Sequence, residues 1–209
     1  MDFEQELSQV LPSDLPHRDA VVTKGARHLE LIAAANAVMN LTRIVSPREA
    51  AIKHVLDSVL PWKMFLGART VLDAGTGPGF PGIPLALVFP ATRFTLADST
   101  QKKARFVESV VRELELPNVT VSSQRVEDLV KSATFDIVTA RAFAPIDRAL
   151  QFLAPALKKG TRALLYKGPD IDQEIAEAGK LRFPVRVAAR YQLPDDMGSR
   201  SIVEADAAT

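Results

Sequence analysis

The sequence predicts an α/β fold: a doubly wound, mostly parallel sheet of seven strands with an antiparallel edge strand, preceded by a small N-terminal helical cap. Strand-like and helical segments alternate from residue 70 onward, which favours a parallel sheet with helices on both faces. The first sixty-odd residues have the apolar spacing of helices. Two strand-like runs joined by a short Pro/Asp/Gly turn end the chain, and they predict an antiparallel pair at the sheet edge.

The cap is expected to cover residues 1–66 and the main domain residues 67–209, within one compact unit. Ser46 and Glu49 form a capping box around Pro47, which stands at the first helical position. The helix that starts there is expected to end before Pro61. In the segment before it, apolar residues recur at near-helical spacing, at Val22, Leu29, Ile32, Ala33 and Val38.

Seven strands are expected in the main domain. They are Thr70–Ala74, Arg93–Ala97, Val119–Ser122, Phe135–Thr139, Arg162–Tyr166, Val185–Tyr191 and Ser201–Glu204. Helical segments separate the first five, and the clearest of them runs from Gln101 to Leu114. A chain of 209 residues with 47% apolar content is large enough to bury the core of one such domain.

The composition excludes several classes of site. The chain has no cysteine, so it has no disulfide, thiolate zinc site or cysteine nucleophile, and we expect no metal. Acidic residues stand where a signal peptide has a basic region, and no run reaches the roughly 18–20 apolar residues of a membrane span. We therefore expect a cytoplasmic protein without a membrane partner. The net charge of +1 leaves a nucleic-acid partner open, because only the distribution of charge would reveal one.

The most informative segment is VLDAGTGPGFPG, residues 71–82. An apolar strand ends in a carboxylate, and Gly75, Gly77 and Gly79 follow at every second position. Glycine lets the backbone approach a ligand, because it has no Cβ. Asp98 ends the next apolar run, 19 residues after Gly79, close to the spacing of about 20 residues typical of ribose-binding carboxylates. The pattern predicts a cofactor of the adenosine type.

Two cofactor classes fit this loop. Gly77-x-Gly79-x-x-Gly82 matches the dinucleotide fingerprint, so a small nicotinamide-dependent oxidoreductase is the first alternative. However, Pro78 and Pro81 remove two N–H groups, and a pyrophosphate site needs such donors. No remaining segment resembles a substrate domain for hydride transfer. A non-catalytic nucleotide-binding module is a second alternative.

S-adenosylmethionine has no phosphate, so it suits the loop better. It needs space for its methionine part, apolar walls for adenine and a carboxylate for the ribose. The glycines can supply the space, and Asp98 can supply the carboxylate. Asp73, two residues before the first glycine, suits a ligand amine or a bound water near the loop.

Several motifs outside the loop extend the pattern. They are Asn40-Leu41-Thr42-x-Ile44, His54-x-x-Asp57-Ser58, Asp98-Ser99, Arg125-Val126-Glu127, Arg141-Ala142-Phe143 and Lys167-Gly168, with the loop itself continuing to Ala86. Over roughly residues 25–170 the chain resembles the glucose-inhibited division protein B family, the bacterial guanine-N7 methyltransferases of 16S ribosomal RNA. Two features depart from the family: Ala35 replaces a frequent aromatic residue, and the C-terminal strand runs into acidic Glu204 rather than ending in a basic residue.

The resemblance implies a class I (Rossmann-like) methyltransferase fold, S-adenosylmethionine as the methyl donor, and 16S ribosomal RNA or the small ribosomal subunit as the partner. It implies that Gly75 and Phe80 contact the cofactor, with Gly77 beside them, and that Asp98 binds the ribose. Val126 and Glu127 would flank the adenine, and Arg141 would lie at the same site. A monomer is expected.

Methylation of guanine N7 requires few catalytic groups, because N7 carries a lone pair and no proton. This agrees with a sequence that offers no acid/base dyad, and Arg141, near the end of a strand, is the expected positioning residue. His54 and Asp57 share one side of a helix, and we expect them to fix the cap against the sheet rather than to act in catalysis. The expected RNA-binding residues are Lys102, Lys103, Arg105 and Lys167.

Overall fold

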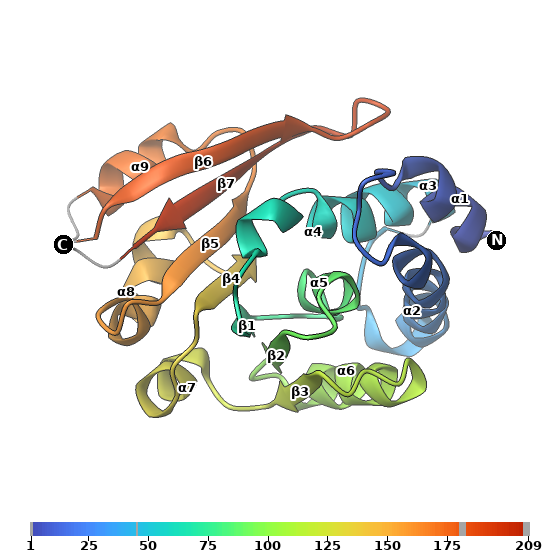
Figure 1. The fold of residues 1–209 in the computed structure, drawn as a ribbon, viewed down its shortest axis with the longest axis horizontal. Helices are drawn as coiled ribbons and strands as arrows, with labels where there is room; N and C mark the ends of the chain where they lie inside the picture. Colours follow the sequence, from blue (N-terminus) through green and yellow to red (C-terminus); the bar gives the residue numbers. More distant parts are fainter. Residues whose placement is uncertain (1, 45, 180–182, 207–209) are drawn as a thin grey trace.

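The computed structural model describes residues 2–44, 46–179 and 183–206. Its centre is one seven-stranded sheet in the order β3-β2-β1-β4-β5-β7-β6 (Figure 1). The strands are β1 (Thr70–Ala74), β2 (Arg93–Ala97), β3 (Val119–Ser122), β4 (Ile137–Arg141), β5 (Arg162–Lys167), β6 (Val185–Gln192) and β7 (Ser199–Ala205). The first five are parallel, and β7 lies antiparallel between β5 and β6. The predicted doubly wound sheet with an antiparallel edge is therefore confirmed.

The strand β4 lies two residues further along the chain than predicted. The carboxylate of Asp136 accepts hydrogen bonds from the backbone N–H groups of Arg69 and Thr70, so this residue joins the preceding bend. At the other end, pairing with β5 continues to Arg141, which is opposite Tyr166. Arg141 is thus the last residue of β4, a central strand, which holds its backbone at the carboxyl ends of the parallel strands.

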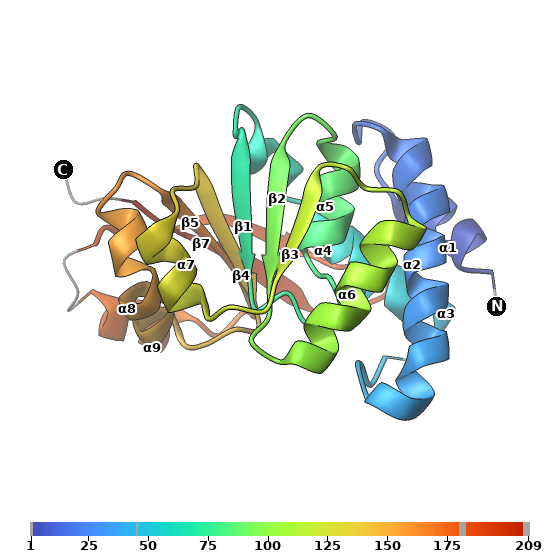
Figure 2. The same cartoon turned by 90° about the horizontal axis from the view of Figure 1, so that it is seen from below.

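Helices cover both faces of the sheet. One face carries α7 (Val126–Ser132), α8 (Ile146–Leu157) and α9 (Asp172–Ala178), as Figure 2 shows. The other carries α5 (Gly82–Val88), α6 (Gln101–Glu113) and the N-terminal helices. Each face has its own cluster of buried apolar side chains. The helix α6, the clearest helical segment of the sequence, is amphipathic, because Phe106, Val107 and Val110 are buried on its inner side.

The N-terminal helices are α1 (Phe3–Val10), α2 (Arg18–Met39), α3 (Pro47–Ala50), a π-helix (Ala51–Leu56), α4 (Asp57–Val59) and a 3₁₀-helix (Trp62–Phe65). Phe3, Leu29 and Phe94 belong to the same apolar cluster, so this part shares a core with the sheet. Although α2 forms as predicted, Val38 is 75% exposed near its end, so its assignment to the apolar face was wrong. The division at residue 66 stays a prediction.

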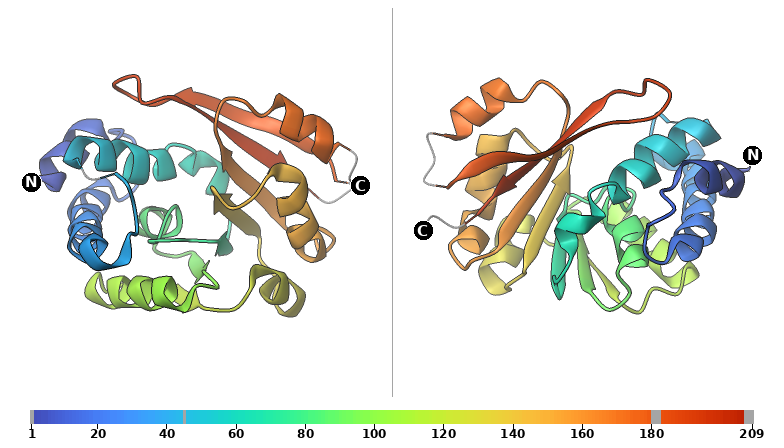
Figure 3. Two further views of the ribbon diagram at one scale, coloured as in Figure 1. Left: turned by 180° about the vertical axis from the view of Figure 1, so that it is seen from behind. Right: turned by 45° about the horizontal axis from the view of Figure 1, so that its top comes forward.

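The Ser46 half of the predicted capping box forms, since its side chain accepts a hydrogen bond from the backbone N–H of Glu49, while the Glu49 carboxylate pairs with Lys53 at 2.6 Å. The sequence did not predict the π-helix that follows, a form often found at functional sites. The β6–β7 hairpin reaches over α3 and this helix (Figure 3), and Asp195 of the hairpin pairs with Arg48 of α3 at 2.7 Å. None of the helices among the described residues is long and apolar enough to cross a membrane.

Candidate cofactor and acceptor site

The sheet reverses its winding direction between β1 and β4. From β1 the chain proceeds outward through β2 to β3 and then returns to β4 on the other side of β1. Open α/β sheets bind ligands at the carboxyl ends of the strands beside such a switch point. The glycine loop, Asp98 and Arg141 follow or end strands at this edge, so the structure brings the main predicted site residues together.

The backbone of the loop requires glycine at its first position. Gly75 has a φ of +71°, and a Cβ there would lie 2.7 Å from Cδ2 of Phe143. Phe143 comes from the segment after β4 and packs edge-on against Phe152 of α8. It is a half-buried side chain at the switch point. Its role was missed at the sequence level, although it belongs to the Arg141-Ala142-Phe143 motif.

All backbone N–H groups of the loop donate hydrogen bonds to other groups of the chain. Gly75 and Thr76 donate to the carbonyl of Ala97, Gly79 and Phe80 donate to the carbonyl of Thr76, and the remaining donors, Gly77 and Gly82, bond to Asp98 and Asp73. Pro78 and Pro81 have no N–H. Across residues 75–82, all of which the structure describes, the backbone therefore has no free donor for a pyrophosphate. This is a physical reason against the dinucleotide alternative.

Asp98 connects the first two strand ends. Its Oδ2 accepts the N–H of Gly77 at 3.1 Å, and its Oδ1 accepts the N–H of Thr100 at 2.9 Å. The residue is 8% exposed. A carboxylate has about four acceptor positions, so acceptor capacity for ribose hydroxyls remains.

Asp73 faces the inside of the loop rather than the crevice. Its Oδ2 accepts bonds from the Thr76 hydroxyl at 2.6 Å and the Gly82 N–H at 2.9 Å. Its Oδ1 is buried without a partner among the described residues. Burial raises the pKa of this carboxyl to about 6, although both hydrogen bonds oppose the rise. A bound water at Oδ1, one of the two partners that the sequence suggests, would satisfy this oxygen; its burial leaves a ligand amine no access from the crevice.

The surroundings of the loop fit a nucleoside cofactor without phosphate. A Cβ on Gly77, whose φ is +59°, would meet no atom within 4 Å, so the space above this residue is open. Val126 begins α7, next to the carboxyl end of β3, and is buried, while Glu127 is half-buried. Open space, the Asp98 carboxylate as an acceptor for ribose hydroxyls and an apolar wall are the features that S-adenosylmethionine requires.

Phe80 is surrounded by other side chains. Its ring is 2% exposed and stacks on His28 and His54, each with a centroid distance of 4.7 Å. The guanidinium of Arg141 lies 5.2 Å from its centroid, within cation–π range. Phe80 therefore supports Arg141 and the two histidines, and its predicted contact with a cofactor stays a prediction.

The two histidines are uncharged at neutral pH. Burial lowers the pKa of His28 to about 4, and its Nε2 donates to the carbonyl of Pro78 at 2.8 Å. Burial, with the positive charge of Arg141, lowers the pKa of His54 to about 3. His54 also bonds to the Thr42 hydroxyl at 3.1 Å. These contacts connect the cap to the loop, as expected for a positioning role.

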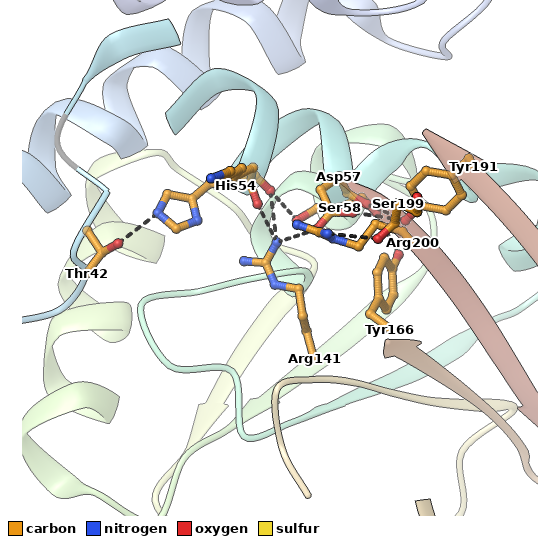
Figure 4. A network of polar contacts seen from close by, with 10 residues as sticks. Thr42, His54, Asp57, Ser58, Arg141, Tyr166, Tyr191, Ser199 and Arg200 are labelled. Atoms are coloured by element: carbon orange, nitrogen blue, oxygen red, sulfur yellow. Dashed lines mark hydrogen bonds and ion pairs between the residues drawn. The ribbon is translucent and has the colours of Figure 1, made fainter. Parts of the chain in front are cut away.

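Asp57 joins the cap to three strands of the sheet, as Figure 4 shows. Its Oδ2 lies 3.5 Å from Nη1 of Arg141 and 3.3 Å from Nε of Arg200, and its Oδ1 accepts the Tyr191 hydroxyl at 3.0 Å. Burial and the Asp57 charge raise the pKa of Tyr191, so the hydroxyl stays a donor. Asp57 thus fixes the cap against the sheet, as expected, whereas the side-chain hydrogen bond of His54 stays within the cap and its contact with the main domain is the stacking on Phe80. Arg200, 143 positions from Asp57, gave no local sequence signal.

The π-helix orients Arg141 through its backbone. Nη1 of Arg141 donates to the carbonyl oxygens of Lys53 and His54, at 3.0 and 3.4 Å. The arginine is therefore fixed by the cap, by Asp57 and by the Phe80 ring, with its side chain 18% exposed.

The predicted RNA-binding residues occupy two places. Lys102 and Arg105 are exposed near the start of α6 and Lys103 is half-buried there; Nζ of Lys102 donates to the carbonyl of Val38 at 3.1 Å. Lys167 lies elsewhere, with a side chain only 14% exposed and paired with Glu174 at 2.6 Å. Lys167 is thus a paired residue of the crevice rather than a free surface cation.

A cavity of about 500 Å³ adjoins Arg141 at the carboxyl ends of β4 and β5. Its lining includes Lys53, Asp57, Arg141, Lys167, Glu174 and Arg200. Among the described residues, no group of three or more His, Asp or Glu side chains is placed to hold a metal ion.

Comparisons with known proteins show the family of this chain. The family model for rRNA small subunit methyltransferase G matches residues 22–192. The ribosomal RNA small subunit methyltransferase G of Solibacter usitatus is 61% identical over 208 residues, covering 98% of this chain and 99% of that protein. The protein of the same name from Carboxydothermus hydrogenoformans is 39% identical, covering 85% and 79%.

Solved structures share the fold at low identity. The O-methyltransferase of Bacillus cereus in complex with SAH has a TM-score of 0.61 and 21% identity, covering 97% of this chain and 96% of that one. Cofactor-bound Rv0187 has a TM-score of 0.61 and 18% identity, covering 94% and 98%. The fold is that of class I methyltransferases, and neither alternative from the sequence finds support here. The chain belongs to the rRNA small subunit methyltransferase G family.

Proposed function

We propose that this protein transfers a methyl group from S-adenosylmethionine to N7 of a guanine in 16S ribosomal RNA. The observation that carries the proposal is the 61% identity to a ribosomal RNA small subunit methyltransferase G over nearly the whole chain. The loop with no free N–H across residues 75–82 supports a cofactor without phosphate.

Alignment is the main catalytic task in this reaction. S-adenosylmethionine supplies, when bound, a methyl group already activated by its sulfonium. Guanine N7 has an in-plane lone pair and no proton, so no base is needed at the attacking atom, and holding it in line is worth several orders of magnitude in rate. The buried, uncharged state of His28 and His54 is compatible with this chemistry.

Each site residue has a proposed task. Asp98 holds the ribose hydroxyls, and Gly75 and Gly77 allow the cofactor to approach the backbone. Val126 and Glu127 flank the adenine, where α7 begins. Phe80 contacts the cofactor from the loop. Arg141, which is held by the Phe80 ring, the Lys53 carbonyl and Asp57, orients the cofactor or the target base.

The RNA is held by positive charge around the crevice. Lys102, Lys103 and Arg105 near the start of α6 are proposed to contact phosphates. Lys167 lies in the part of the crevice that receives the RNA base, where it pairs with Glu174. The protein acts in the cytoplasm, as a monomer and without a metal. The monomer is supported by the exposed surface: among the described residues the large apolar side chains that are exposed are Val38 and Leu66, too few for a stable interface.

The test is mass spectrometry of ribosomal RNA from a strain lacking the gene, with and without a plasmid copy. The proposal expects one 7-methylguanosine of 16S ribosomal RNA to disappear and to return with the plasmid. Unchanged methylation would contradict it. Titration of the purified protein with S-adenosylhomocysteine and NADH distinguishes the alternatives: binding of the first without any methylated RNA would indicate a non-catalytic module, and binding of NADH alone an oxidoreductase.

A further inference from the structure

The cavity beside Arg141 has a definite position relative to the cofactor loop. Arg141 and Ala142 line it, and the next residue, Phe143, packs against Gly75. The strand β4 lies between β1, which carries the loop, and β5, which carries Lys167. A base in this cavity would therefore have one edge toward the loop and the opposite edge toward β5 and α9. Its volume of about 500 Å³ is within the range of small-molecule sites.

Two carboxylates line this cavity, and they differ in acceptor capacity. Asp57 is 3% exposed, and both of its oxygens accept bonds, from Tyr191, Arg141 and Arg200. Glu174 is 32% exposed. Its Oε2 accepts Lys167 Nζ at 2.6 Å and the N–H of Ile146 at 2.9 Å.

Oε1 of Glu174 has no hydrogen-bond partner among the described residues. Lys167 is itself fixed, since its Nζ also donates to the carbonyl of Ala144 at 2.9 Å. The carboxylate of Glu174 is thus oriented by two donors on one oxygen and has its other oxygen available. Such a preoriented acceptor suits a ligand that carries hydrogen-bond donors.

We propose that the cavity binds the target guanine and that Glu174 reads its Watson–Crick edge. This rests on the proposed function. Guanine carries N7 and O6 acceptors on one edge and the 2-amino donor on another, with the N1–H donor beside it. Because N7 must face the methyl donor, the N1–H and 2-amino groups face β5 and α9, where Glu174 lies. Adenine presents an unprotonated N1 at that position, so the carboxylate repels it.

The inference implies that the guanine leaves its stack to enter the cavity, as in other enzymes that act on a base. The cavity wall also carries Lys53, which pairs with Glu49 at 2.6 Å, and Arg200, which pairs with Asp57 at 3.3 Å. We expect their positive charge to favour the O6 acceptor and the adjoining phosphate. Glu174 is accordingly a specificity-determining residue, and Lys167 is the residue that positions it.

The test combines a protein variant with a base variant. Methylation kcat/KM is measured for wild type and Glu174→Gln on small subunits whose mapped target is guanosine or inosine, which lacks the 2-amino group but keeps N7. A charge-assisted hydrogen bond to that group predicts that inosine lowers the wild-type value about 10–100-fold. In Glu174→Gln the same replacement is expected to cost about threefold or less. Glu177→Gln, an exposed residue of the same helix, is the matched control and should behave as wild type.

An equal inosine effect in wild type and Glu174→Gln would overturn the role of Glu174, even if both enzymes methylate guanosine. If Glu174 had only a structural role, Glu174→Gln would lower kcat/KM for guanosine and inosine by the same factor. The inosine effect would then be equal in the two enzymes, which is the result that overturns the proposal. If Glu174→Gln melts much below wild type, the comparison is made below its melting temperature, because the ratio of kcat/KM for the two substrates within one variant does not depend on the fraction that is folded. If wild type methylates no guanosine, the proposed function fails, and this inference fails with it.

Discussion

Oδ2 of Asp98 accepts the backbone N–H of Gly77 at 3.1 Å, so the carboxylate at the end of β2 holds the loop that follows β1. One side chain thereby fixes the shape of the loop and remains available to a sugar. The contact also explains why the site needs both strands in register, since β1 and β2 pair from Thr70 opposite Arg93 to Ala74 opposite Ala97. A small shift of either strand end would change both the shape of the loop and the position of the carboxylate that is available to the sugar.

Gly77→Ala is expected to weaken cofactor binding more than it weakens the fold. The new Cβ meets no protein atom within 4 Å, so the stability cost is that of a left-handed alanine, about 1–2 kcal/mol. In the complex the Cβ would occupy ligand space, which should lower affinity for S-adenosylhomocysteine at least about tenfold. Calorimetric titration and thermal unfolding measure the two effects.

Gly67→Ala is the matched control, because Gly67 has a φ of +81° and equally open surroundings but lies before β1, away from the loop. It should show the same loss of stability with unchanged affinity. Equal affinities for the two variants would mean that the space above Gly77 does not belong to the cofactor.

Asp73→Asn is expected to remove a pH dependence of stability. Burial raises the folded-state pKa of Asp73 from 3.8 to about 6, so the folded protein binds the proton more tightly than the unfolded chain. The resulting stabilisation is complete below pH 4 and is lost as the pH rises through 6, with a change of about 3 kcal/mol. Urea unfolding between pH 4 and 7 should show this difference between wild type and Asp73→Asn, and parallel curves would refute it.

Arg141→Ala is expected to lower methylation about 100-fold, because a small misplacement of reacting groups has effects of this size. Single-turnover rates and calorimetric affinity for S-adenosylhomocysteine would measure the change. Tyr191→Phe is the control: it removes a hydrogen bond to Asp57 without changing a residue of the cavity wall, so it should lose stability but little rate. A full rate together with unchanged cofactor affinity in Arg141→Ala would remove this residue from the site.

Reversing the charges near the start of α6, with Lys102→Glu and Arg105→Glu together, should weaken RNA binding about tenfold or more. If both side chains contact phosphates, the slope of log affinity against log salt should fall by about 1–2. Filter binding at several salt concentrations measures it. Lys63→Glu changes a cation just before β1, near the amino ends of the parallel strands, and should leave the slope unchanged. If the double variant also kept the wild-type slope, these residues would be ordinary solvated surface.

The sequence predicted the parts of the fold that depend on local pattern. The strands β1, β2 and β3 have the predicted bounds, because each is a short apolar run between turn residues. The Ser46 cap followed from a motif of four residues. The glycine loop and Asp98 are close in sequence to the strand ends that bring them together, so their proximity could be inferred.

Contacts between distant segments could not be inferred in this way. The pairing of Asp57 with Arg200 and Tyr191, and the stacking of His54 on Phe80, depend on tertiary packing. The pair of Lys167 with Glu174 is another case, since the sequence made this lysine look free to bind RNA. Val38 followed the helical period but lies near the end of α2, where no partner element covers it.

The central claim is that the loop after β1 holds the methionine part of S-adenosylmethionine while Asp98 holds its ribose. A crystal structure of the protein with S-adenosylhomocysteine in excess tests this most directly. We expect the ribose hydroxyls within hydrogen-bond distance of the Asp98 carboxylate, the amino-acid part above Gly77 and the adenine beside Val126. A ligand bound elsewhere, or a crevice left empty at saturating concentration, would contradict the account.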